Sequence, residues 1–159
     1  MSNYKTEIKW ALIFAAMGLI WMLLERLVGL HDTHIDKHPI YTNLIAVPAI
    51  AIYVFALLDK RKNDLGGIMT FKQGLITGLI ITAIVTLLSP LTQYITSTLI
   101  TPEYFNNAIT YSVETGKVTQ EDAEGFFNLR NYIMMGLMSA PIMGLVTSLV
   151  VAFFTKKTE

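Results

Sequence analysis

The stretch GLITGLIITAIVTLLSPLTQYI, residues 74–95, decides the fold of this chain. It contains no charged side chain, and a helix needs roughly 20 apolar residues to cross a ~30 Å hydrocarbon core. Three further apolar segments are bounded by charge, and a water-soluble bundle would need a polar face on each helix. We therefore predict an all-α, integral membrane four-helix bundle. Its four transmembrane helices are expected at about 8–28, 40–58, 72–96 and 130–155.

The long connection between the third and fourth spans, residues 102–129, predicts a helical hairpin on the outer face rather than a disordered loop. Pro102 and Glu103 suit the first turn of a helix, and Gly116 suits its end. Thr119 with Asp122 resembles a capping box that starts a second arm. We expect this arm to run without a break into the fourth span, and residues 1–159 to form a single domain.

Charged residues are distributed unequally between the two sides of the predicted membrane. The side with both termini and the 59–72 connection carries eight of the 12 basic residues and four of the 12 acidic ones. The positive-inside rule then places both termini in the cytoplasm.

The net charge of zero gives no indication of nucleic-acid binding. Because the sequence contains no cysteine, disulfide and thiolate chemistry are excluded.

Small residues recur at every fourth position along the third and fourth spans. They are Gly74, Gly78, Thr82 and Thr86 in the third, and Gly136, Ala140, Gly144, Ser148 and Ala152 in the fourth. Such spacing lets the backbones of two membrane helices approach closely. We expect the two ladders to face each other within the chain, although they would also suit a dimer.

Several polar residues are expected near one leaflet boundary, on the outer side. They are Glu25, Asn43, Gln93 and Arg130. A Glu25–Arg130 pair would tie the first span to the fourth. The group suits either a structural network or a small polar binding site.

Prolines interrupt three spans, at Pro48, Pro90 and Pro141. They suit either ordinary kinks or the broken helices that line a transport site.

All three histidines lie in one loop segment, HDTHIDKH, residues 31–38. His34 and His38 have the i, i+4 spacing of one helix face, and His31 lies one turn earlier. With Asp32 or Asp36 they supply enough ligands for zinc or a similar divalent metal. Pro39 disfavours a regular helix through His38, and a polar, pH-sensitive loop is the alternative. No other motif indicates catalysis.

Six strings along the chain are distinctive. They are HDTHIDKH at 31–38, YTN at 41–43, YVFAL at 53–57, MTFKQG at 69–74, LSPL at 88–91 and TPEYF at 101–105. Together they resemble the bacterial membrane family called domain of unknown function 4199, over nearly the whole chain. The resemblance implies a four-span protein of the bacterial inner membrane. It implies no activity, cofactor or site residue.

The first functional interpretation is a non-enzymatic component of the bacterial inner membrane. It would offer its acidic outer surface to a membrane protein partner, or assemble with itself. The alternative is a small transporter or metal-handling protein that uses residues 31–38, and an intramembrane enzyme is a third possibility. A cavity that reaches Gln93 or Asn43 would favour transport, whereas a solid bundle with an apolar patch on the hairpin would favour a partner.

Overall fold

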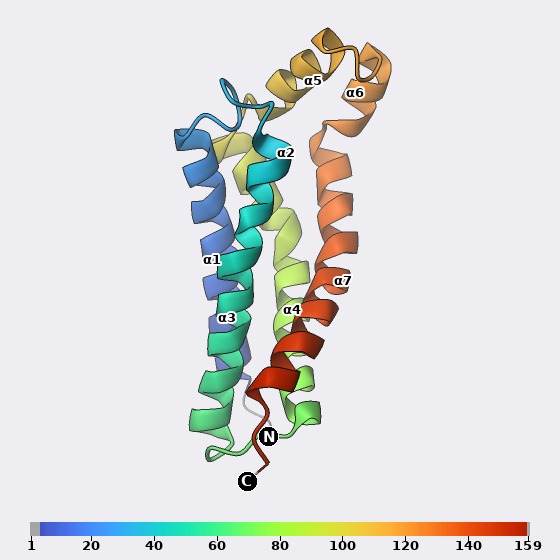
Figure 1. Cartoon of the computed structure of the whole chain (residues 1–159). Helices are drawn as coiled ribbons and strands as arrows, with labels where there is room; N and C mark the ends of the chain where they lie inside the picture. Colours follow the sequence, from blue (N-terminus) through green and yellow to red (C-terminus); the bar gives the residue numbers. More distant parts are fainter. Residues whose placement is uncertain (1–3, 159) are drawn as a thin grey trace.

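Four long helical elements run side by side as an antiparallel bundle in the computed structural model, which describes residues 4–158 (Figure 1). The elements are α1 (Lys5–Leu27), α2 (His38–Tyr41), η1 (Thr42–Ile45), α3 (Ala46–Asp59), η2 (Lys60–Asp64), α4 (Phe71–Ile95), η3 (Thr96–Ile100), α5 (Tyr104–Glu114), α6 (Gln120–Phe126) and α7 (Leu129–Thr155). η1 is a 3-10 turn, and η2 and η3 are π-helical turns that extend α3 and α4. The predicted all-α fold is confirmed.

The two ends of the bundle differ. Both chain ends lie at one end with the connection between α3 and α4, and we call this the termini end (Figure 1). The short helices α2, α5 and α6 lie at the opposite end, which we call the hairpin end (Figure 1). The predicted helical hairpin is thus confirmed as α5 and α6.

Four helical stretches are long and apolar enough to cross a membrane. They are Lys5–Leu27, His38–Asp64, Phe71–Ile100 and Leu129–Thr155. Only 11% to 28% of the most apolar part of each stretch is buried inside the protein, so most of this apolar surface faces outward. An apolar surface of this extent requires lipid rather than water around it. The predicted bundle with four membrane-spanning helices is therefore confirmed.

The third and fourth spans make the most extensive helix–helix contact, between α4 and α7. Their small residues face each other there, as predicted. A Cβ atom added at Gly78 would overlap the side chain of Ser148, and one added at Gly144 would overlap Thr82. The two backbones approach closely because the glycines present no side chain at these points.

A capping box starts the third span. The backbone N–H of Gln73 donates to Thr70 Oγ1 at 3.2 Å, and the backbone N–H of Thr70 donates to Gln73 Oε1 at 2.8 Å. This reciprocal capping box starts α4 at Phe71.

The hairpin does not run continuously into the fourth span, and that expectation was wrong. Thr119 caps α6 as predicted, by accepting from the backbone N–H of Asp122. However, α6 ends at Phe126, and Asn128 adopts an extended conformation and starts α7 by accepting from the backbone N–H of Asn131 at 2.9 Å. Asparagine competes for backbone donors in this way, which favours a new helix start over a continuous helix.

The buried core lies in the termini half of the bundle. Its members are Ala11, Tyr53, Ala56, Leu57, Met69, Ile81, Val151 and Ala152. The hydroxyl groups of Tyr53 and Thr82 hydrogen-bond at 2.7 Å between α3 and α4. The hairpin half contains two cavities, which continue from the polar site described next.

Candidate metal centre

Glu25 lies in the last turn of α1 with its side chain 2% exposed. Trp21 lies one turn earlier on the same helix face, and its Nε1 donates to Glu25 Oε1 at 2.5 Å. A carboxylate buried in this way needs donors or cations for its second oxygen as well. That oxygen, Oε2, is the atom on which the loop histidines converge.

The loop 28–37 returns the chain over the end of α1. Gly29 has a φ of +79°, a left-handed conformation that favours glycine and ends the helix. The backbone N–H of Leu30 then donates to the carbonyl of Glu25 at 2.9 Å, and that of His34 to Gly29 at 2.7 Å. These turns bring His31, 5% exposed, back over the Glu25 carboxylate.

His31 and His38 both contact Glu25. Their Nε2 atoms lie 3.0 and 3.3 Å from Glu25 Oε2, and one ligand atom from each of the three residues lies within 4.8 Å of the other two. Zinc binds histidine nitrogen and carboxylate oxygen at about 2.0–2.2 Å, which separates tetrahedral ligands by roughly 3.3–3.5 Å. The donor types and spacing therefore fit a zinc site with three protein ligands.

Tyr104 of α5 covers the two imidazoles. Its ring centroid lies 5.1 Å from that of His31 and 5.2 Å from that of His38, and its hydroxyl lies 3.3 Å from the hydroxyl of Tyr132. Burial raises the pKa of Tyr104, and the hydrogen bond with Tyr132 offsets part of that rise. Tyr104 is thus a neutral hydroxyl at neutral pH, not an anionic metal ligand.

A cavity of about 200 Å³ adjoins the histidines. Its walls are formed by Met22, His31, His38, Thr42, Gln93, Thr96, Ser97, Thr101, Tyr104 and Tyr132. Most of these side chains carry a hydroxyl, an amide or an imidazole. A fourth metal ligand in this cavity, water or a small molecule, would therefore meet neutral hydrogen-bonding groups. No aspartate or glutamate of residues 4–158 lines it.

Only one of two further polar groups of His31, its backbone carbonyl and its Nδ1 atom, has a hydrogen-bond partner among residues 4–158. The backbone carbonyl of His31 accepts from Asn107 Nδ2 at 2.9 Å, which ties the loop to α5. The His31 Nδ1 atom is buried without a hydrogen-bond partner in the part of the chain that the structure describes. A histidine that binds metal through one nitrogen normally donates the other N–H to an acceptor. Here a water molecule would have to supply that acceptor.

The predicted metal ligands are brought together only in part. His31 and His38 converge, whereas His34 and Asp36 are exposed and lie outside the cluster. Residues 28–37 form successive turns instead of a helix, so the i, i+4 spacing of His34 and His38 does not place them on one face. The third converging side chain, Glu25, was predicted only as a member of the outer polar cluster.

The structure does not bring the four residues of the predicted outer polar cluster together. Gln93 lines the histidine cavity, whereas Asn43 is exposed and donates to the backbone carbonyl of Pro39 in α2. Arg130 is exposed, and the expected Glu25–Arg130 pair is replaced by the pairs of Glu25 with the two histidines. The reason lies in the packing, since α1 and α7 lie on opposite sides of the hairpin end (Figure 1).

Two more cavities continue from the histidine cavity into the bundle. The first, of about 250 Å³, shares Met22, Gln93 and Thr96 with it. The second, of about 340 Å³, shares Phe14, Ile45, Val85, Ser139 and Ala140 with the first, and it reaches Asn43. The site thus lies at one end of a series of adjoining cavities, and the last of them reaches Tyr53 of the buried core.

Comparison with known proteins identifies a family but no characterised relative. Residues 9–157 match the sequence model of a family described as "Protein of unknown function (DUF4199)". No curated protein and no solved structure matches the chain.

Proposed function

The chain belongs to the DUF4199 family, and on the geometry of its hairpin end we propose that it is a metal-handling protein of the bacterial inner membrane. It would hold zinc or a similar divalent ion with Glu25, His31 and His38. The observation that carries this proposal is the convergence of three ligand atoms from α1, the following loop and α2 within 4.8 Å. Two imidazoles and one carboxylate, with a fourth position open, form a known zinc ligand set.

We propose binding of the ion rather than catalysis. A hydrolytic zinc site needs a general base beside the metal-bound water. The carboxylate nearest the ion position, Glu25, is itself a ligand, and no other carboxylate of residues 4–158 lines the cavity. The protein would then receive, retain or pass on the ion as a non-enzymatic component.

Transport through the bundle is supported less well. The cavities that reach Gln93 and Asn43 are the feature expected of a transporter. Their walls are mainly apolar, however, and an ion passing through them would lose its hydration without replacement ligands.

Exposed acidic side chains of the hairpin, including Glu121, Asp122 and Glu124, would be the surface on which a protein partner or a second copy docks.

Zinc titration of the detergent-purified protein at pH 7.5 tests the proposal. We expect a calorimetric binding signal in the wild type and a loss of affinity of more than about 100-fold in the double variant His31→Ala/His38→Ala, since both imidazole ligands are removed. His34→Ala is the matched control, because His34 belongs to the same loop but is exposed. A double variant that binds zinc as the wild type does would refute the site, as would an absence of binding in the wild type.

The orientation of the protein is a separate prediction. The unequal distribution of basic residues supports cytoplasmic termini and a hairpin on the outer face. Because the sequence has no cysteine, single cysteines can be introduced at Asn63 and Lys117 without background. An impermeant maleimide added to intact cells should label position 117 and spare position 63. The reverse labelling pattern would show that the topology is the opposite of the one predicted.

A further inference from the structure

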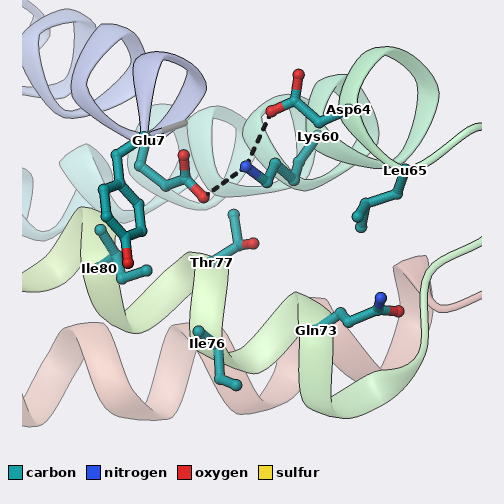
Figure 2. A pocket seen from close by; sticks show the side chains of 9 residues that line it. Glu7, Lys60, Asp64, Leu65, Gln73, Ile76, Thr77 and Ile80 are labelled. Atoms are coloured by element: carbon teal, nitrogen blue, oxygen red, sulfur yellow. Dashed lines mark ion pairs between the residues drawn. The ribbon is translucent and has the colours of Figure 1, made fainter. Parts of the chain in front are cut away.

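The termini end holds a second cluster of buried charge, independent of the histidine site. Glu7 of α1 has a side chain only 2% exposed, and Lys60 Nζ donates to its Oε1 at 2.9 Å. The same ammonium donates to Asp64 Oδ2, also at 2.9 Å. Figure 2 shows Lys60 between the two carboxylates, which come from α1 and from the π turn at the end of the second span.

The Glu7 carboxylate retains an unused acceptor. Its Oε2 atom is buried and has no hydrogen-bond partner among residues 4–158. A buried carboxylate oxygen without a donor costs free energy, so such an atom marks a position where a donor is missing. Around it, two carboxylates, Glu7 and Asp64, share the walls with one lysine, Lys60, which leaves an excess of negative charge.

Glu7 lines a cavity of about 470 Å³ that both polar and apolar side chains surround. The charged cluster, Gln73 and Thr77 supply polar groups, and Leu65, Ile76 and Ile80 supply apolar side chains (Figure 2). The cavity lies at the ends of membrane-spanning helices, which is the depth of lipid headgroups. A molecule that fits it needs a cationic hydrogen-bond donor next to an apolar portion.

We propose that this cavity binds a primary ammonium group carried on an apolar chain. The ammonium, with three N–H donors, would donate to Glu7 Oε2, while the chain packs along Ile76 and Ile80. A divalent metal fits less well because the Lys60 ammonium, 2.9 Å from this carboxylate, would repel its two charges more strongly than the single charge of a second ammonium. In addition, the group of three potential metal ligands found among residues 4–158 lies at the hairpin end. Phosphatidylethanolamine and a free alkylamine both present this chemistry.

The test uses the full chain in phosphatidylcholine nanodiscs with and without phosphatidylethanolamine. The two headgroups have the same net charge, but only ethanolamine offers ammonium N–H donors. We expect phosphatidylethanolamine to raise the unfolding temperature by about 3 °C or more. Glu7→Gln should abolish this rise, because its amide would place N–H groups toward the ammonium. Glu103→Gln, at an exposed glutamate of the hairpin end, should retain it.

A second arm separates the two sources of ammonium. n-Hexylammonium chloride is added to the phosphatidylcholine nanodiscs, with hexyltrimethylammonium as its matched control. If only phosphatidylethanolamine raises the unfolding temperature in a Glu7-dependent way, the site binds a lipid headgroup. If hexylammonium raises it as well, the site also binds free amines. Ile76→Trp enlarges an apolar side chain that lines the cavity and leaves Glu7 and Lys60 unchanged in sequence, so it should also lose the rise, and the test stands even if Glu7→Gln does not fold. Equal responses of the wild type and both cavity variants in both arms would overturn the proposal.

Discussion

Gly78→Ala and Gly144→Ala will each lower the free energy of unfolding by about 1–3 kcal/mol, the usual cost of inserting a methyl group into a packed interface. The new Cβ at position 78 would overlap Ser148, which is fully buried, and that at position 144 would overlap Thr82. Thr82 cannot turn away without losing its 2.7 Å hydrogen bond to Tyr53. The helices α4 and α7 must therefore move apart.

The same substitution at Gly18 is the control. Nothing lies within 4 Å of a Cβ atom built there, and Gly18 lies within a helix, α1. Alanine favours a helix over glycine by up to ~1 kcal/mol, so Gly18→Ala should be neutral or stabilising. Thermal unfolding in detergent, followed by circular dichroism, measures all three variants. Equal unfolding temperatures for the three would contradict the packing of the ladders.

Features of the fold that depend on local sequence were predicted well. The four spans follow from the length of the apolar segments, and the Thr119 cap follows from short-range hydrogen bonding. The α4–α7 contact could also be predicted, because small residues at every fourth position let the backbones of two membrane helices approach more closely than larger residues would. The break at Asn128 was missed, since its side chain can cap a helix or lie on its surface with the same sequence around it.

The site could be predicted only in part, because it depends on how separate elements return to one point. Three histidines in eight residues indicated a metal site, but helical spacing also counted His34 and Asp36 as ligands. The positive φ of Gly29 and the turns after it instead present His31 and His38 to the end of α1. No local pattern states that Glu25 lies beneath them, and the same holds for Tyr104, which comes from the distant hairpin.

Glu25→Leu is expected to have the second large effect, on both stability and metal binding. The carboxylate accepts from Trp21 and contacts His31 and His38, all within a site where its own side chain is 2% exposed. Its removal leaves buried donors without an acceptor, at about 1–3 kcal/mol for each group. We expect a loss of roughly 2–5 kcal/mol in the free energy of unfolding, and no measurable zinc binding.

Glu25→Gln separates the structural role of this residue from its role as a ligand. Glutamine preserves the shape and can still accept from Trp21, but it removes the negative charge that a divalent ion requires. Its unfolding temperature should therefore lie between those of the wild type and Glu25→Leu, while its zinc affinity falls as far as in the histidine double variant. Glu103→Leu, at an exposed position on the hairpin end, controls for removal of a carboxylate and should alter neither quantity. Wild-type zinc affinity in Glu25→Gln would show that the carboxylate is not a ligand and that Glu25 serves only to hold the two imidazoles in place.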